Sequence, residues 1–469
     1  MVKPPKIVVI GAGSAIFGLG AMATIIRSER MRGAELVLVD INEPALETMT
    51  QLAEMMNQAW GAEMTISGTT NRREALPGAD FVIVSVQVGD RETVWEMDWQ
   101  IPLRHGIHQP YAENGGPGSI AHTARNMPLM LDIAYDMEEL CPDAWYLNLT
   151  NPLIRLTWGV ARYTRVKVLG LCHQLLWGYA MAGAVLADRF GISVPEGFHV
   201  HTNADNMPNF IPVARAALEH LDIKAAGINH FSWVYDIRDR KTGEDLYPEL
   251  RERWLKHYRR DFEPLTREAF EIFGMMPTPG DAHLCEFLPW VSDPATKPWE
   301  KYHLTHQDWE GNRRRRERRR ALAESIVAGR TSVDELRDVW KHDILEEPVV
   351  DIMAAIHFND NYYNQQLNIP NNGGLIPNLP ADAIVEVPGM ISGLGVQGMG
   401  MPPLPEGIAE LCRRELELSS LVVEAAVHGD RQLLLQALLL DPMVHDIDTA
   451  RAIMHDFLVE FADFLPQFA

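Results

Sequence analysis

The sequence has few cysteines, no long apolar run and a deficit of positive charge. Four cysteines occur in 469 residues, too few for a disulfide framework, so a reducing compartment is expected. No run reaches the roughly 18 apolar residues that a membrane-spanning helix needs, and the chain opens on a strand-like segment instead of a signal sequence. We therefore expect a folded cytoplasmic protein without a membrane partner.

The charge balance argues against a nucleic-acid partner. Asp and Glu number 64 against 42 Lys and Arg, and the formal net charge is −22. A polyanion would be repelled by such a surface. One segment runs against this trend, because residues 313–320 are arginine at every position except Glu317. We expect a helix there, whose arginines face either solvent or a second subunit, or else bind an anion.

The first part of the chain alternates strand and helix patterns. Apolar, β-branched runs predict strands, and longer periodic stretches between them predict helices. This alternation is typical of a Rossmann-like α/β fold with a doubly wound parallel sheet. The predicted strands are 7–10, 35–40, 65–69, 81–86, 145–149 and 166–171, and the predicted helices are 21–30, 43–60 and 127–140.

The pattern changes near residue 200. Strands and helices then mix without regular alternation, which predicts an α+β substrate domain. Long helical stretches at 407–428, 431–439 and 449–461 predict C-terminal helices that pack on the sheet or on a partner subunit. We predict two domains, a dinucleotide-binding domain at 1–195 and a substrate, metal and oligomerisation domain at 196–469.

A glycine turn follows the first predicted strand. Gly11 and Gly13 allow a tight turn and close approach of the backbone to a pyrophosphate, although the third glycine is displaced to Gly18. Asp40 ends the next strand, where an acid binds a ribose hydroxyl and repels a 2′-phosphate, so NAD is favoured over NADP. Alternatively, Asp40 caps the helix that follows. The predicted cofactor-binding residues are Gly11, Gly13, Ser14, Phe17, Asp40 and Gln87.

A cysteine and a histidine follow two other predicted strands. Cys172 ends one strand and His230 follows another, 230 − 172 = 58 residues later. A thiolate and an imidazole together can bind a borderline-soft divalent ion and leave coordination positions open. By spacing alone, either side chain could equally belong to the core.

Five motifs in this order resemble glycoside hydrolase family 4, the NAD- and divalent-metal-dependent glycosidases. They are the glycine turn at 11–18, Asn-Gly-Gly-Pro-Gly at 114–118, Leu-Thr-Asn-Pro at 149–152, Gly-Leu-Cys-His at 170–173 and Gly-Ile-Asn-His at 227–230. The resemblance runs from residue 6 to about 395. It is strongest to the branch of α-glucosidases and α-galacturonidases, or to a close sister family.

The resemblance implies roles for particular residues. Cys172 and His230 would bind the metal, expected to be Mn²⁺, and Asn151 would contact sugar hydroxyls. Asn114 and Arg125 would also bind substrate, unless Arg125 is an ordinary helix-surface arginine.

Two further residues would be catalytic. His173 falls where family members place a catalytic or substrate-contacting polar residue. Asp281 would be the base, although other branches of the family use a tyrosine. After Asp281, the segment 282–287 departs from the pattern of relatives that have a basic residue nearby.

The family route implies a redox cycle without net redox. NAD oxidises the sugar at C3, which makes the C2 proton acidic, and a base removes it with the metal as Lewis acid. Elimination, addition of water and return of the hydride complete hydrolysis. We expect the substrate to be a small-molecule α-glycoside. Its sugar could be neutral or acidic, and the acidic candidates are a galacturonide, a glucuronide and a sulfoquinovoside.

Alternatives remain at the level of the whole protein. An NAD-dependent sugar or hydroxy-acid dehydrogenase with net redox turnover is the competing activity. The polar, aromatic segment 356–372 could face the site or form an ordinary surface loop. A homodimer or homotetramer is the family-level expectation.

Overall fold

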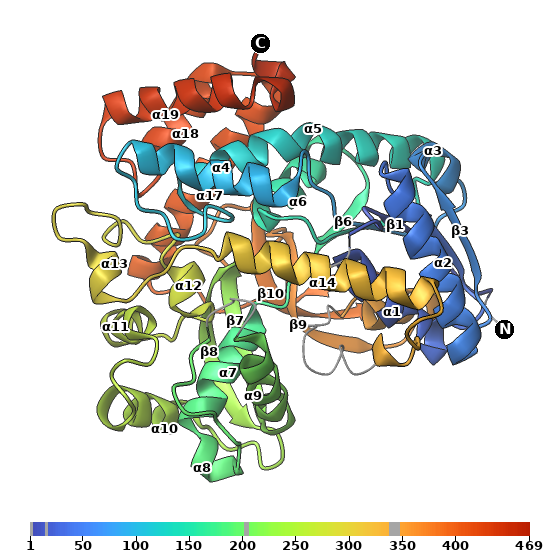
Figure 1. The fold of residues 1–469 in the computed structure, drawn as a ribbon. Helices are drawn as coiled ribbons and strands as arrows, with labels where there is room; N and C mark the ends of the chain where they lie inside the picture. Colours follow the sequence, from blue (N-terminus) through green and yellow to red (C-terminus); the bar gives the residue numbers. More distant parts are fainter. Residues whose placement is uncertain (1–2, 15–16, 201–205, 337–347) are drawn as a thin grey trace.

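The first six strands form the predicted parallel sheet. The computed structural model describes residues 3–14, 17–200, 206–336 and 348–469 (Figure 1). Six parallel strands run in the order β3-β2-β1-β4-β5-β6, which is the doubly wound order of dinucleotide-binding folds. Their bounds are β1 Lys6–Ile10, β2 Glu35–Val39, β3 Thr65–Thr69, β4 Phe81–Val84, β5 Trp145–Asn148 and β6 Lys167–Gly170. The predicted fold class is confirmed.

An antiparallel extension continues the same sheet. After β6 come β9 (Tyr362–Pro370), β10 (Ile384–Ser392), β7 (Leu221–Ile228) and β8 (Phe231–Asp239), each antiparallel to its neighbour. The short β11 (Gly395–Gly398) pairs with β10. Across the described residues the result is one sheet of 11 strands. The middle of the chain and its later part therefore share hydrogen bonds with the dinucleotide-binding half.

Helices cover the parallel half of the sheet. They are α1 (Phe17–Ile26), α2 (Glu43–Trp60), α4 (Arg91–Arg104), α5 (Gly116–Leu140), α6 (Leu153–Tyr163) and α16 (Val349–Phe358). Asn42 caps α2 by accepting a hydrogen bond from the backbone N–H of Ala45. The helix predicted over 127–140 begins at Gly116, because Pro117 fits the first turn, where its missing N–H is not needed.

The C-terminal helices pack against helices from the first part of the chain. The helices α17 (Glu406–His428), α18 (Arg431–Leu440) and α19 (Ile447–Glu460) lie beside α4, α5 and α6 (Figure 1). The apolar core reflects this arrangement. One buried cluster joins the parallel sheet to the C-terminal helices, and a second is confined to residues 175–276. The predicted boundary between residues 195 and 196 stays a prediction.

The second cluster forms the lower lobe in Figure 1. It packs α7 (Leu175–Val185) and α9 (Met207–His220) against β7 and β8. Within the described part of the chain, no helix combines the length and apolar character needed to span a membrane.

Candidate active site

The glycine turn after β1 fits closely between the ends of β2 and β4. The backbone N–H groups of Gly11 and Ala12 donate to the carbonyl oxygen of Val39, at 2.9 and 3.1 Å. Gly11 has φ +89°, and a Cβ there would stand 1.9 Å from the carbonyl oxygen of Ser85. Only glycine fits this backbone conformation and this contact.

The second glycine meets the acid predicted to bind ribose. The N–H of Gly13 donates to Oδ2 of Asp40 at 2.8 Å, and a Cβ on Gly13 would lie 2.7 Å from that oxygen. The other carboxylate oxygen of Asp40 accepts from the N–H of Asn42 at 2.8 Å. Since Asn42 is itself the cap of α2, Asp40 is not the helix cap of the alternative interpretation. It binds the glycine turn to the end of β2.

A cavity of about 720 Å³ opens at this turn. Its lining brings together most of the residues predicted to bind the cofactor, and one predicted to bind substrate: Gly11, Gly13, Ser14, Asp40, Gln87 and Asn151. Phe17 is the first residue of α1, and its side chain lies outside the described part of the structure. The glycines leave the backbone open to the cavity, so the residues present fit a dinucleotide.

Cys172 and His230 lie side by side. The Sγ atom of Cys172, just after β6, is 3.3 Å from Nε2 of His230. His230 occupies the tight turn between β7 and β8 with φ +62°, a left-handed conformation that costs a non-glycine residue roughly 1–3 kcal/mol and often marks functional sites. Burial, with smaller effects of His283 and His173, lowers the pKa of His230 well below its usual range. The imidazole is therefore neutral and has a lone pair to offer.

The donor set fits a divalent metal. A sulfur and an imidazole nitrogen converge, a pairing that suits borderline-soft divalent ions. In addition, Nδ1 of His230 and Oδ1 of Asn229 are buried without a hydrogen-bond partner. Among the described residues no group of three or more His, Cys, Asp and Glu side chains could bind a metal. Two protein ligands would leave the remaining positions to oxygen ligands.

His283 and Glu286 lie next to the pair of Cys172 and His230. The sequence patterns did not single out either residue. The ring of His283 stacks on that of His230, with centroids 4.6 Å apart and 6° between the planes. Nδ1 of His283 lies 2.9 Å from Oε2 of Glu286, and Oε1 of Glu286 accepts the N–H groups of Glu113 and Asn114, both at 3.1 Å. The available signal was the His-x-x-Glu spacing, in which His283 lies on the short helix α12 (Gly280–Leu284) and Glu286 lies in the turn directly after it.

Asn114 is positioned by this contact. It is buried, and Glu286 anchors its backbone. Its side-chain amide donates to Glu113 at 3.4 Å. The predicted substrate contact of Asn114 stays a prediction.

Glu386 on β10 is hydrogen-bonded near both Cys172 and His230, the predicted metal ligands. Its carboxylate is buried and accepts hydrogen bonds from four side chains: Asn229 at 2.8 Å, Ser232 at 2.8 Å, Gln366 at 2.9 Å and Asn368 at 3.2 Å.

Two of these contacts involve the segments that carry Cys172 and His230. Asn229 precedes His230 in the turn, and Oε1 of Gln366 accepts the N–H of Leu175, three residues after Cys172. Glu386 thereby connects the segment of Cys172 to the segment of His230, as residues behind metal ligands do. A single acid inside the apolar run 384–387 was its only signal in the sequence.

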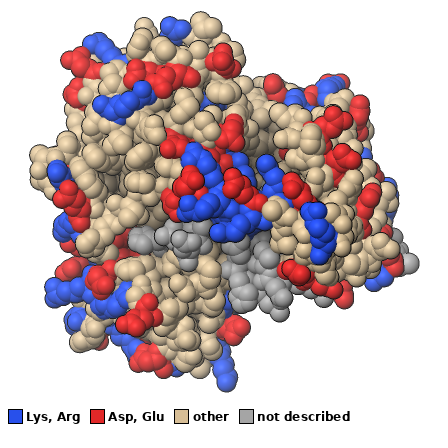
Figure 2. Space-filling model, viewed as in Figure 1, with Lys and Arg blue, Asp and Glu red and all other residues tan. Residues whose placement is uncertain are grey.

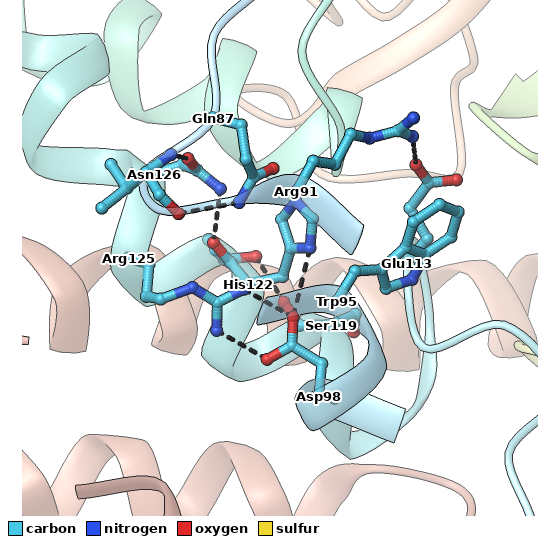
Figure 3. Close-up of polar contacts among 12 residues, drawn as sticks. Gln87, Arg91, Trp95, Asp98, Glu113, Ser119, His122, Arg125 and Asn126 are labelled. Carbon is cyan, nitrogen blue, oxygen red and sulfur yellow. Dashed lines mark hydrogen bonds and ion pairs between the residues drawn. The ribbon is translucent and has the colours of Figure 1, made fainter. Parts of the chain in front are cut away.

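Arg125 does not have the contacts of a substrate ligand. Its guanidinium pairs with both carboxylate oxygens of Asp98, at 2.6 and 2.5 Å, and its side chain is fully buried. Figure 3 shows Arg125 and His122 on α5 both directed at Asp98 on α4. The guanidinium also lies over the ring of Phe461, 4.4 Å from its centroid. Arg125 is neither on the helix surface nor open to a ligand, and it instead joins α4, α5 and the C-terminal segment.

Asp281 has structural contacts. Its carboxylate accepts the backbone N–H groups of Leu265 at 3.0 Å and Thr266 at 2.7 Å, at the start of α11 (Pro264–Phe273). Burial and the neighbouring Glu263 raise the pKa of Asp281 well above its usual range. Each carboxylate oxygen of Asp281 accepts one of these hydrogen bonds. These contacts do not support the assignment of Asp281 as the base.

His173 lies at a second cavity. Its ring stacks on Trp177, with centroids 5.5 Å apart, and with Cys172 it lines a cavity of about 330 Å³. Tyr362 and Tyr363 of β9 line the same cavity. The polar, aromatic segment is therefore partly strand, and it faces a cavity that reaches Cys172.

Comparisons with known proteins agree over nearly the whole chain. The family described as "Family 4 glycosyl hydrolase" matches residues 6–183, and its C-terminal domain matches residues 225–444. An alpha-glucosidase of Erwinia rhapontici is 31% identical over 93% of each chain.

Solved structures give the same result. The Bacillus subtilis protein lplD, named as a candidate glucosidase, superposes with a TM-score of 0.80 at 26% identity, over 97% of this chain and 99% of that one. A 6-phospho-alpha-glucosidase from gut microorganisms, in complex with NAD and Mn²⁺, covers both chains fully with a TM-score of 0.77 at 20% identity, a likeness of fold. On these matches and on the order of its motifs, the chain belongs to glycosyl hydrolase family 4.

Proposed function

We propose that this enzyme hydrolyses α-glycosides, with NAD restored in every cycle and a divalent metal, Mn²⁺, bound by Cys172 and His230. One observation carries the proposal. Asn151 follows β5 and lines the dinucleotide cavity, while Cys172 follows β6, the neighbouring parallel strand. Because both strands end at the same edge of the sheet, the predicted cofactor and metal sites adjoin each other.

The chemistry needs both sites. When bound, NAD would supply reversible oxidation at C3 of the sugar, and the metal would supply a Lewis acid for the sugar oxygens. The chain's own residues hold and orient these groups. Cys172 and the neutral His230 present the donors, Asn151 faces the dinucleotide cavity and can reach sugar hydroxyls, and Glu386 with Glu286 holds the turns in place.

The relatives support this choice of substrate class and cofactors. The Erwinia rhapontici relative is named an alpha-glucosidase, and the gut 6-phospho-alpha-glucosidase was solved with NAD and Mn²⁺. Acidic α-glycosides remain part of the proposal for the sugar.

A glycosidase assay tests the proposal. Nitrophenyl α-glycosides with neutral, uronic, sulfonated and phosphorylated sugars are incubated with enzyme, NAD and Mn²⁺. We expect nitrophenol release that depends on NAD and on the metal, without accumulation of NADH, and exchange of the C2 hydrogen in D₂O. Accumulation of NADH in proportion to product would identify a dehydrogenase instead.

Two variants identify the residue that removes the C2 proton. Asp281→Asn tests the sequence prediction, and Tyr111→Phe tests a tyrosine whose ring lies 5.0 Å from that of His283. Loss of C2 hydrogen exchange, with NAD and Mn²⁺ binding retained, identifies the base. If Asp281→Asn instead lowers thermal stability while exchange continues in the folded fraction, its role is to hold α11.

Location and assembly also remain proposals. The four cysteines, all within the described residues, form no disulfide bond with one another, which favours a location in the cytoplasm. Leu439, Leu440, Ile447 and Val459 are exposed on or beside the C-terminal helices, which favours a homodimer or homotetramer. Light scattering of the purified protein determines the assembly.

A further inference from the structure

The arginine-rich segment forms a helix that lies across the dinucleotide groove. This helix, α14 (Trp309–Val327), packs against both α2 and α4, and Figure 1 shows it crossing in front of the sheet. The helix predicted for this segment is present. Not all of its arginines face solvent or a second subunit, because Arg316 and Arg320 line the cavity at the glycine turn.

The first half of α14 is fastened to α4 by ion pairs. Arg313 pairs with Glu96, and Arg316 pairs with Glu92 at 2.5 Å. Glu92 is buried, so this attachment is sheltered from solvent. Figure 2 shows the resulting mixture of basic and acidic side chains over the middle of this face.

The second half of α14 rests on α2 beside the glycine turn. Arg320 and Ala323 line a small cavity together with Gly13, Asn42 and Pro44. Arg320 also lines the large cavity with Gly13, Ser14 and Asp40. A cation from the later part of the sequence thus stands at the turn that approaches a dinucleotide.

Other arginines at this cavity are paired with carboxylates. Arg72 pairs with Asp136, and Arg91 pairs with Glu113. In the described part of the chain, no carboxylate lies within ion-pair distance of the exposed Arg320. Its charge is therefore available to a ligand, whereas the paired arginines are largely neutralised.

We propose that α14 covers the bound dinucleotide and that Arg320 binds its pyrophosphate. A guanidinium matches phosphate oxygens in geometry and charge, and the glycine turn supplies backbone N–H groups from the other side. Building on the proposed function, in which NAD is restored in each turnover, such a contact keeps the cofactor on the enzyme between cycles.

Direct titration of the full-length enzyme with NAD, without substrate, tests the assignment. The variant is Arg320→Ala, and the matched control is Arg318→Ala, which removes an exposed arginine of the same helix that lines neither cavity. We expect Arg320→Ala to weaken NAD binding by roughly tenfold or more, the usual value of a hydrogen-bonded charge. Arg318→Ala should bind NAD as the parent does, and both variants should melt as the parent does.

Two further probes locate the contact. ADP-ribose should lose affinity in Arg320→Ala as NAD does, whereas adenosine, which has no phosphate, should not. Equal NAD binding by the two variants overturns the proposal. A larger loss for NADP than for NAD overturns the pyrophosphate assignment in favour of a 2′-phosphate contact. If the parent enzyme binds no NAD, the proposed function itself fails.

Discussion

The two candidate sites on the sheet are built in opposite ways. At the parallel half, the dinucleotide cavity is shaped by backbone, with Gly11 and Gly13 pressed against Ser85 and Asp40. The proposed metal pair joins the two halves, because Cys172 follows the parallel strand β6 and His230 lies between β7 and β8. It is held by buried side chains whose hydrogen bonds converge on Glu386. This difference indicates which kind of substitution should disrupt each site. The cofactor cavity should be damaged by an added methyl group, and the metal pair by the loss of a buried acceptor.

The largest effect is expected at Glu386. In Glu386→Ala, several buried donors lose their acceptor, at about 1–3 kcal/mol for each unsatisfied group, so the free energy of unfolding should fall by about 3 kcal/mol or more. Urea denaturation measures it.

Glu386→Gln serves as the control for that change. Its amide oxygen can still accept from the side-chain amides, and its nitrogen can donate to the hydroxyl of Ser232, so most of the stability should remain. Equal destabilisation by both variants would show that charge matters more than the acceptor geometry.

A smaller but more selective effect is expected at Cys172. Cys172→Ser removes the soft ligand, and the affinity for Mn²⁺ should fall by about a hundredfold or more, since even residues behind the ligands are worth about 10–100-fold. Metal binding is followed by electron paramagnetic resonance, and NAD binding should not change. A parallel loss of NAD affinity would mean that the two sites are not separable.

The smallest effect is expected at Gly13. In Gly13→Ala the new methyl group forces the Asp40 side chain to move, so NAD affinity should fall by about tenfold, or about 1.4 kcal/mol, with Mn²⁺ binding retained. Gly400→Ala is the control, because a Cβ at Gly400 meets no atom within 4 Å. Calorimetric titration with NAD gives both values, and an unchanged affinity in Gly13→Ala would contradict a backbone-shaped cavity.

The same contrast explains which features the sequence predicts well. The positions of the parallel strands and the glycine turn depend on local signals, namely β-branched runs and glycines at fixed offsets, so these features of the parallel half could be predicted. The pairing of β6 with β9 joins Gly170 to Asn368. No local sequence pattern predicts a contact between residues so far apart in the chain.

The roles of single charged residues were harder to predict. Arg125 and Asp281 lie in suggestive motifs, but their partners, Asp98 and the start of α11, are chosen by tertiary packing. Glu386 has no motif at all, because what matters is the set of buried amides that surrounds it. Conversely, Cys172 and His230 came together as the resemblance implied, at 3.3 Å.

The unbroken sheet has a mechanical consequence. Many two-domain enzymes close on their substrates by bending at a linker between separately folded parts. Here ladder hydrogen bonds from β6 through β9 and β10 to β7 span the junction between the cofactor side and the metal side. Bending at that junction would break strand pairing, so we expect the distance between the dinucleotide cavity and the proposed metal pair to be set by the sheet and not by a hinge between two domains.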